Sequence, residues 1–381
     1  MKVTINKSIA NGSVFAPPSK SMAHRLLICS YLAGGGSVSG LEYSDDIIAT
    51  EGCLEALKSG KTELYCNESG STLRFMLPLC LILNKQITLF GTERLLSRSL
   101  EVYADICKEQ GIYFCQQKNS VTVKGMLGAG HYKVRGDISS QFISGLMFVL
   151  PTFNGDSVIE IIGNLESKPY LDLTVKSLLD FGVKVDFCEN TIKIKGNQTY
   201  NKTDVTVEGD YSNAAFFDAL AVIGGNVTVN GLLKDSLQGD RVYKEYFDAL
   251  KNGTPTLDVS DCPDLAPILM AVAAAKNGCT LTGTRRLKIK ESDRGAAMAA
   301  ELAKLGAKVD NLENSITVYK CDKLKSARLC GHNDHRIVMA LSVLLTLCGG
   351  EIEGAQAVNK SFPDFFERLS GIGIEVMQSE A

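Results

Sequence analysis

The sequence lacks several features that define large classes of protein. Its twelve cysteines include no C-x-x-C pair, and spacings such as Cys107 to Cys115 fit no zinc-binding pattern. The longest apolar runs, such as 337–348, are shorter than the roughly 18 residues that a membrane-spanning helix needs. Forty basic residues against 43 acidic ones give a formal charge of −3, without the basic excess of nucleic-acid and membrane-surface proteins. We therefore expect no metal, nucleic acid or membrane among the partners.

The same absences favour a cytoplasmic protein, which we expect to be a monomer. Residues 1–5 have the pattern of a strand rather than of a signal peptide. Most cysteines lie in apolar runs, for example Cys80, and this is typical of buried free thiols in a reducing compartment. His332 and His335 could face one metal ion, but no cysteine or carboxylate arrangement supports such a site.

No low-complexity linker divides the 381 residues, although a chain of this length usually forms two domains. The organisation comes instead from a repeat in which a helical pattern ends at a glycine and a short alternating strand follows. We predict that each glycine caps its helix in the left-handed conformation. Six copies predict six α/β units, three in each domain, with a boundary near 209–211; the glycines are Gly60, Gly111, Gly182, Gly253, Gly306 and Gly373.

Several predicted helices are apolar on all sides, including 142–150, 265–275 and 336–348. A helix without a polar face belongs in the interior of a domain. The sequence therefore predicts two α/β domains with helices inside and sheets outside, and with helix starts converging at one mouth.

These helices start in an unusual way, with a serine or aspartate followed closely by a cation. Serine and aspartate are good N-caps, but a cation there opposes the helix dipole unless an anion is bound. The pattern predicts a site for highly anionic small molecules. It occurs in full or in part at Ser19-Lys20-Ser21 with Arg25, Gly70-Ser71-Thr72-Leu73-Arg74, Ser139-Ser140-Gln141, Ser167-Lys168-Pro169-Tyr170, Glu291-Ser292-Asp293-Arg294 and Asp334-His335-Arg336.

Two carboxylates are candidates for acid–base chemistry, and each has a plainer alternative. Asp264 opens an apolar helix, so it is either an N-cap or a base for a substrate hydroxyl. Glu291 lies in the densest charge cluster, 288–294, which is either a solvated face or part of a site. Among so many cations Glu291 should be ionised, and it could donate a proton only if substrate anions counter those cations.

The remaining candidates concern binding. Ser21 and Arg25 are four residues apart and share a helix face beside Lys20, although an ordinary capped surface helix would look the same. The serines near 139 and 167 suit a phosphate held by neutral donors. Arg98 and Lys360 are lone cations on predicted loops.

In their order along the chain, these segments resemble the 5-enolpyruvylshikimate-3-phosphate synthase family of enolpyruvyl transferases. The similarity extends from Pro17-Pro18-Ser19-Lys20-Ser21 to Lys360-Ser361-Phe362-Pro363-Asp364. It implies transfer of the enolpyruvyl group of phosphoenolpyruvate to the 5-hydroxyl of shikimate 3-phosphate, in aromatic amino-acid biosynthesis. A tetrahedral intermediate forms and phosphate leaves by C–O cleavage, with no cofactor or metal.

The resemblance also implies a fold and a set of site residues. The fold is two inside-out α/β domains of three βαβαββ-type units, with one lobe formed by 1–16 and 212–381, the other by 17–211, and the active site in the cleft between them. Asp264 is implied as the base and Glu291 as the acid, with Lys20 assisting. Shikimate 3-phosphate is implied to contact Lys20, Ser21, Arg25, Ser139, Ser140, Gln141, Ser167, Asp264 and Lys290. Phosphoenolpyruvate is implied to contact Lys20, Gly70, Arg98, Gln141, Arg294, Arg336 and Lys360.

Charge supports this assignment. That set contains seven cationic side chains and two carboxylates, Asp264 and Glu291, so its net charge is +5. The two substrates together carry about −5 to −6, because each has a phosphate and a carboxylate. We expect the lobes to stand apart when empty and to close on their ligands.

The sequence also departs from the family pattern and leaves two alternatives. Ser71 and Phe75 replace the usual threonine and proline in a loop that shapes glyphosate binding, so the resemblance does not carry over sensitivity to that inhibitor. Arg286 stands near the place of a substrate-binding asparagine of some members, and that contact is not carried over. The alternatives are the sister transferase for UDP-N-acetylglucosamine, which usually has Lys-Asn where this chain has Lys20-Ser21, and a non-catalytic anion-binding repeat protein.

Overall fold

The computed structural model describes residues 1–379, and the chain forms two compact units. Unit 2 is the continuous segment Pro18–Val207, and unit 1 combines Met1–Pro17 with the chain from Glu208 onward. The junction after Val207 comes earlier than the predicted one after residue 211. The reason is that Tyr211 is buried in the core of unit 1, so the start of its helix belongs with that unit.

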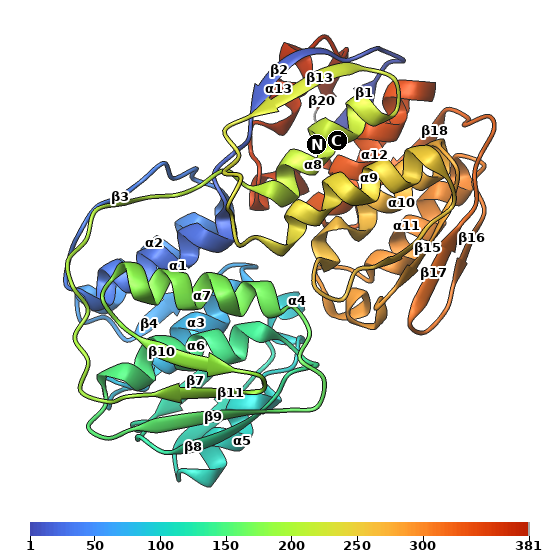
Figure 1. The fold of residues 1–381 in the computed structure, drawn as a ribbon. Coiled ribbons are helices and arrows are strands. Elements are labelled where there is room, and N and C mark those ends of the chain that lie inside the picture. The colour runs from blue at the N-terminus through green and yellow to red at the C-terminus, as the bar shows by residue number, and fades with distance from the viewer. Residues whose placement is uncertain (380–381) are drawn as a thin grey trace. The chain divides into compact units, whose positions relative to one another are not determined.

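Unit 2 contains two four-stranded sheets and one parallel pair of short strands (Figure 1). The first sheet has the order β4-β5-β7-β6, from Glu63–Tyr65, Gln86–Phe90, Ser120–Lys124 and Tyr113–Gln116. The second has the order β10-β11-β9-β8, from Val185–Cys188, Thr191–Ile194, Ser157–Ile162 and His131–Arg135. The pair joins β12 (Val205–Thr206) to β3 (Val38–Ser39).

The helices of unit 2 connect these strands. They are α1 (Lys20–Leu32), α2 (Asp45–Lys58), α3 (Gly70–Cys80), α4 (Glu93–Leu96), α5 (Glu101–Glu109), α6 (Ser140–Val149), the 3-10 turn η1 (Leu150–Thr152) and α7 (Lys168–Asp180).

Unit 1 repeats the same plan. One sheet has the order β18-β19-β1-β20, from Ala327–Cys330, Gly350–Glu353, Lys2–Ile5 and Val376–Ser379. Another has the order β14-β15-β17-β16, from Thr256–Asp258, Cys279–Thr282, Ser315–Val318 and Val309–Asn311. A parallel pair joins β13 (Asn226–Asn230) to β2 (Asn11–Phe15).

The helices of unit 1 include four 3-10 segments. The α-helices are α8 (Tyr211–Val222), α9 (Tyr243–Asn252), α10 (Ala266–Ala275), α11 (Arg294–Lys304), α12 (His335–Cys348) and α13 (Phe365–Gly371). The 3-10 segments are η2 (Gly239–Val242), η3 (Pro263–Leu265), η4 (Arg285–Ile289) and η5 (Ala355–Lys360).

The apolar helices occupy the centre of each unit, as the sequence predicts. In unit 2, α3 packs on α6, and nearly every residue of both helices is buried. In unit 1, α10 packs on α12 and both contact α8. The strands cover these helices with one apolar face, which is why β8 alternates between buried and exposed residues. The two units have separate cores that share no residue.

The glycine repeat is confirmed in five of its six copies. Gly60, Gly111, Gly182, Gly306 and Gly373 have φ between 67° and 95°, the left-handed conformation expected after a helix. The prediction for Gly253 is wrong, because its φ of 175° is extended backbone that other residues also adopt. There the chain leaves α9 directly toward β14. The strands that follow the six glycines all belong to four-stranded sheets, and the two parallel pairs of strands lie outside the six copies. The copies therefore do not correspond to six equal units.

All twelve cysteines are free thiols, as predicted, and seven are buried. Cys188 and Cys330 are exposed, so burial does not extend to every thiol. Within residues 1–379, the helices are all too short or too polar to cross a membrane.

Candidate active site

In unit 1, Arg294 is the centre of a charged cluster. It is the first residue of α11, whose N-cap Asp293 accepts a hydrogen bond from the Ala296 N–H at 3.0 Å. The side chain of Arg294 is only 2% exposed. Its guanidinium donates to Asp264 at 2.7 Å, to Glu291 at 2.8 Å and to Asp334 at 2.9 Å. The two carboxylates predicted as base and acid are thus held by one buried cation.

The protonation states of this cluster follow from burial and charge. Burial disfavours the charged guanidinium, but Asp334, Glu291 and Asp264 outweigh it and raise the pKa of Arg294 well above its usual value. Burial also opposes ionisation of Asp264, yet three neighbouring cations hold its pKa well below the ordinary value. Burial lowers the pKa of Lys290, and Asp264 opposes that shift. Asp264 is therefore a carboxylate at neutral pH.

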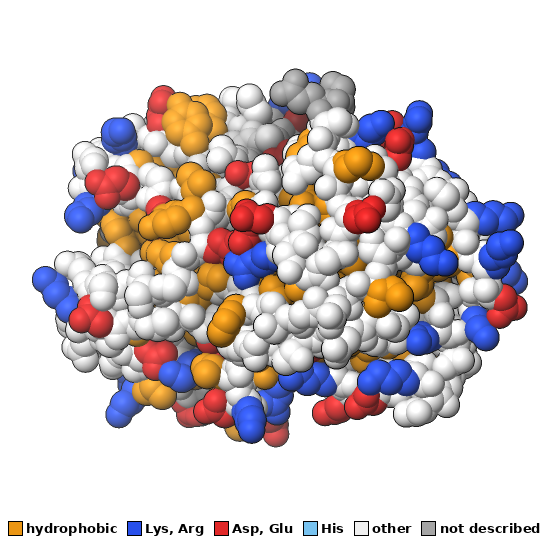
Figure 2. Space-filling model, turned by 90° about the horizontal axis from the view of Figure 1, so that it is seen from above, with side chains coloured by type: hydrophobic (Ala, Val, Ile, Leu, Met, Phe, Trp, Pro, Cys, Tyr) orange, Lys and Arg blue, Asp and Glu red, His pale blue; other side chains and the backbone are white. Residues whose placement is uncertain are grey.

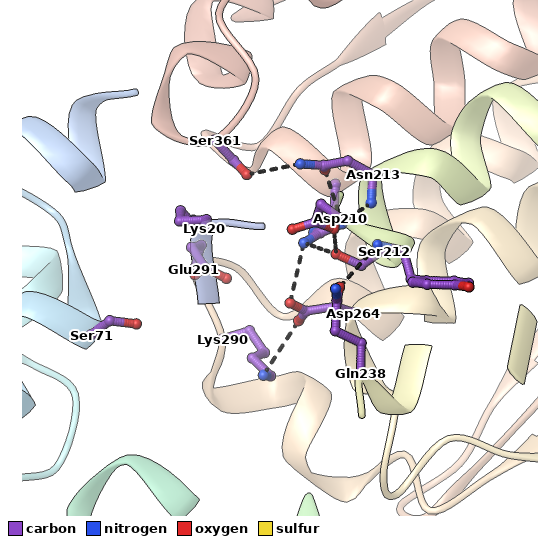
Figure 3. Close-up of polar contacts among 12 residues, drawn as sticks. Lys20, Ser71, Asp210, Ser212, Asn213, Gln238, Asp264, Lys290, Glu291 and Ser361 are labelled. Carbon is purple, nitrogen blue, oxygen red and sulfur yellow. Dashed lines mark hydrogen bonds and ion pairs between the residues drawn. The ribbon is translucent and has the colours of Figure 1, made fainter. Parts of the chain in front are cut away.

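Asp264 contacts these cations instead of capping a helix. It lies in η3, and its side chain makes no cap to α10, whose N-cap is Leu265. Besides Arg294, its carboxylate lies 3.5 Å from Lys290 Nζ (Figure 3) and 3.3 Å from Arg336 Nη2. The N-cap alternative for Asp264 is therefore wrong, and its position fits a reactive group that cations orient.

The start of α12 brings Arg336 into the same cluster. The N-cap Asp334 accepts hydrogen bonds from the backbone N–H of Arg336 at 2.9 Å and from Ser292 Oγ at 3.0 Å, and it is fully buried. The Arg336 guanidinium donates to Ser212 Oγ at 2.7 Å and to Asn213 Oδ1 at 3.2 Å, both on α8. Lys360 ends η5 and donates to the Asn333 carbonyl at 2.7 Å, so it lies in a 3-10 helix rather than in the predicted loop.

In unit 2, the predicted residues at the start of α1 lie together. Lys20 Nζ pairs with Asp46 on α2 at 2.6 Å. Arg25 is buried, and its guanidinium donates to the Ser21 carbonyl at 2.6 Å, to Thr174 Oγ1 at 2.9 Å and to the Tyr170 carbonyl at 2.9 Å. Burial lowers the pKa of Arg25 to about 10, with a small opposing effect of Tyr170. The Ser21 carbonyl accepts from Arg25, consistent with the predicted shared face.

Gln141 and Gly70 occupy the starts of two neighbouring helices in unit 2. Gln141 on α6 accepts from Arg74 Nη1 and donates to Ser71 Oγ on α3, both at 2.9 Å. At Gly70 a Cβ atom would lie only 2.7 Å from Arg98 Nη1, so the absence of a side chain lets this arginine lie against α3.

Three serines of the predicted phosphate site lie at the starts of α6 and α7, which pack on one another. Ser139 caps α6 by accepting from the Gln141 N–H at 3.3 Å, and Ser140 follows it in the first turn. Ser167 is the N-cap residue of α7, with a left-handed φ of 61°. Ser140 and Ser167 are both buried.

Several residues that the structure places in these clusters had no predicted role. Asp46 neutralises Lys20, and Asp334 is a third carboxylate on Arg294, so the predicted count of two acids is too low. The start of α8, with Asp210, Ser212 and Asn213, was missed because no cation follows its cap. An N-cap aspartate before an apolar helix is the signal that could have found it.

The metal interpretation of His332 and His335 finds no support. His332 Nε2 lies 2.8 Å from the buried Glu301 carboxylate instead. Among residues 1–379, no three His, Cys, Asp or Glu side chains are grouped so that they could hold a metal ion. Figure 2 shows acidic and basic side chains interspersed on the face drawn, in keeping with the balanced charge.

Comparison with known proteins identifies the family. The family model described as EPSP synthase (3-phosphoshikimate 1-carboxyvinyltransferase) matches residues 37–369. The chain belongs to the EPSP synthase family. It is 41% identical to the 3-phosphoshikimate 1-carboxyvinyltransferase of Clostridium kluyveri, with 98% of each chain covered. The enzyme of the same name from Clostridium novyi is 39% identical, with 97% of this chain and 98% of that one covered.

Solved structures of an EPSP synthase and of another enolpyruvyl transferase share the fold. EPSP synthase from Acinetobacter baumannii superposes with a TM-score of 0.78 at 22% identity, over 99% of this chain and 100% of that one. The enolpyruvyl transferase NikO from Streptomyces tendae gives a TM-score of 0.77 at 14% identity, over 100% of this chain and 99% of that one. The predicted membership of the EPSP synthase family and the predicted α/β fold are both confirmed.

Proposed function

We propose that this chain is a 3-phosphoshikimate 1-carboxyvinyltransferase that transfers the enolpyruvyl group of phosphoenolpyruvate to the 5-hydroxyl of shikimate 3-phosphate. The observation that carries the proposal is Asp264, a carboxylate in contact with three cations and joined through Arg294 to a second carboxylate, Glu291. Such a group of charges suits proton transfer between anionic substrates. Full-length relatives of that name support the choice of substrates.

The reaction is an addition followed by an elimination. Asp264 accepts the proton of the 5-hydroxyl as its oxygen attacks C2 of phosphoenolpyruvate, and Glu291 gives a proton to C3, so that a methyl group and a tetrahedral ketal form. Glu291 then takes a proton back from that methyl group, and the C2–O bond to phosphate breaks. The leaving phosphate takes the proton held by Asp264, and the enol ether and inorganic phosphate are released. Lys20 assists these proton transfers. All four P–O bonds stay intact throughout, because the bond that breaks is the one between C2 and the ester oxygen.

The binding roles divide by substrate. Shikimate 3-phosphate is bound by hydroxyl, amide and ammonium or guanidinium groups of Lys20, Ser21, Arg25, Ser139, Ser140, Gln141, Ser167 and Lys290, with Asp264 at its reacting hydroxyl. Phosphoenolpyruvate is bound by Lys20, Gly70, Arg98, Gln141, Arg294, Arg336 and Lys360. The Nε atoms of Arg98 and Arg336 are buried and form no hydrogen bond within residues 1–379. Buried donors normally have a partner, so these two atoms support the binding of an anionic ligand.

The substrates themselves adjust the base. In the ligand-free chain three cations hold the pKa of Asp264 low, so the carboxylate is a weak base. Anionic groups that accept hydrogen bonds from Lys290 and Arg336 weaken this hold and raise the pKa of Asp264. Asp264 thus becomes a stronger base only when the substrates are bound, and with them the 5-hydroxyl whose proton it accepts.

A phosphate-release assay tests the function. Purified protein with phosphoenolpyruvate and shikimate 3-phosphate should release one phosphate per enol ether formed, and none without the acceptor. UDP-N-acetylglucosamine serves as the control acceptor for the sister transferase. Release with that acceptor alone, or no release with either, would overturn the proposal.

We further propose that the charged cluster of unit 1 and the predicted site residues of unit 2 bind the same pair of substrates. We also propose that the enzyme acts in the cytoplasm as a monomer. Twelve free thiols fit a reducing compartment. If one pair of substrates engages both clusters, adding both should lower the radius of gyration in small-angle scattering. Light scattering on the same samples gives the mass, and a dimer mass would contradict the monomer.

A further inference from the structure

Arg336 is held by an element far from it in sequence. Its Nη2 donates to Ser212 Oγ at 2.7 Å and its Nη1 to Asn213 Oδ1 at 3.2 Å, across 124 and 123 residues of sequence. The same Nη2 lies 3.3 Å from Asp264 Oδ2. The start of α8 therefore fixes the end of the guanidinium that reaches the proposed base.

The start of α8 is itself rigidly placed. Asp210 caps the helix by accepting from the Asn213 N–H at 2.8 Å, and its own N–H donates to the Pro17 carbonyl at 2.7 Å. The Tyr211 N–H donates to Gln238 Oε1 at 2.9 Å. Asp210, Ser212 and Asn213 are all buried. These side chains therefore have little freedom to move.

The direction of each hydrogen bond follows from the chemistry of the groups. A guanidinium has no acceptor, and an ionised carboxylate has no donor. The Ser212 hydroxyl must therefore donate to Asp210 Oδ1, 2.7 Å away, and accept from Arg336 with its lone pair. Donation therefore runs outward from Arg336, through Ser212 to Asp210 on one side and directly to Asp264 on the other. The two successive bonds of the arm from Arg336 through Ser212 to Asp210 strengthen one another.

We infer that Ser212 and Asn213 are positioning residues for Arg336, and the inference rests on the proposed function. They hold the two terminal nitrogens of the guanidinium, while Nε is buried and bonds to no other group of the described chain. Arginine has a long side chain with many rotamers, so fixing it beforehand lowers the entropy lost when phosphoenolpyruvate binds. Loss of this support should weaken phosphoenolpyruvate binding more than shikimate 3-phosphate binding.

The test compares Ser212→Ala with a matched serine on α12. Ser342 is fully buried, and its hydroxyl donates to the Val338 carbonyl. For Ser212→Ala we expect the KM for phosphoenolpyruvate to rise about 10-fold or more, as for a lost hydrogen bond to a charged group. The KM for shikimate 3-phosphate should change less than about twofold. Ser342→Ala should leave both KM values unchanged, and Ser212→Thr, which keeps the hydroxyl, should recover most of the affinity.

A double-mutant cycle shows whether Ser212 acts through Arg336. In an Arg336→Lys background, Ser212→Ala should change kcat/KM for phosphoenolpyruvate less than about twofold, because its partner is gone. Equal losses in both backgrounds, or equal effects of Ser212→Ala and Ser342→Ala, would overturn the inference alone. An inactive wild-type enzyme would instead overturn the proposed function and this inference with it.

Discussion

Glu291, the proposed acid, is a carboxylate that is held in place but remains partly exposed. One of its oxygens accepts a hydrogen bond from Arg294 at 2.8 Å, which orients the group, and its side chain is 24% exposed. We predict that Glu291→Gln lowers kcat by about 10²- to 10⁴-fold, because the amide cannot give its proton to carbon. Shikimate 3-phosphate binding, measured by calorimetry, should persist.

The control for that substitution is Glu367→Gln, an exposed residue of α13 with no proposed role. It should have wild-type kcat. A near-normal kcat for Glu291→Gln would remove Glu291 from the mechanism.

Gly70 stands at a position where a side chain would collide with Arg98. A Cβ there would meet Arg98 Nη1 at 2.7 Å, closer than van der Waals contact allows, so Gly70→Ala must displace this arginine. We predict that the KM for phosphoenolpyruvate rises by about 10-fold or more, the loss of one charge-assisted hydrogen bond.

Gly52→Ala in α2 provides the comparison, because nothing lies within 4 Å of its Cβ position. It should keep wild-type kinetics and stabilise the fold by about 0.5 to 1 kcal/mol. Unchanged kinetics in Gly70→Ala would mean that Arg98 does not bind the substrate from its present position.

At the scale of elements, Asp334 joins two helices. It caps α12, accepts from Arg294 at the start of α11, and is fully buried. We predict that Asp334→Asn lowers the free energy of unfolding by about 2 to 4 kcal/mol, because Arg294 keeps its charge but loses its most buried partner. Urea denaturation measures this. Asp293→Asn, where asparagine caps equally well, should change stability by less than about 0.5 kcal/mol, and similar values for the two variants would contradict the role of Asp334.

A second contact ties α11 to the loop before α12. Buried Glu301 accepts from Lys304 at 2.8 Å and from His332 at 2.8 Å. Burial opposes its ionisation, but these two partners outweigh burial and lower the pKa of Glu301. A lowered pKa in the folded state adds stability above the unfolded pKa, about 4.3 for glutamate, and this stability is lost as the pH falls through the folded value.

The difference in unfolding free energy between wild type and Glu301→Gln should therefore be constant near neutral pH and shrink below about pH 4.3. Urea titrations over that range measure it. A difference that stays constant in acid would show that Glu301 is not ionised in the folded state.

Local signals predicted the elements better than the contacts between them. Ser69, Ser139, Asp293 and Asp334 cap their helices through side-chain hydrogen bonds, as helix propensities suggest. The pairing of Lys20 with Asp46 and of Arg294 with Asp334 spans 26 and 40 residues, and no local pattern encodes such a partner. At Gly253 a local signal was itself misleading, because a glycine after a helix need not adopt the left-handed conformation. The site residues themselves came from the family resemblance more than from spacing.

At the scale of the whole molecule, the two cores are independent. Unit 2 is one continuous segment, and its core includes residues from α1 through Val207. We predict that residues 18–207 expressed alone fold cooperatively, with a single urea transition and dispersed amide resonances. Non-cooperative unfolding of this fragment, with the full chain as reference, would show that unit 2 depends on the rest of the protein.

The position of β1 has a consequence for biosynthesis. This strand, Lys2–Ile5, lies between β19 and β20 and pairs with both, so its partners are translated long after it. On the ribosome β1 must wait without its sheet, while Pro18–Val207 can already collapse on its own core. Strand β1 therefore reaches its sheet only after β19 and β20 have been made, and a chain released before then would leave this strand unpaired.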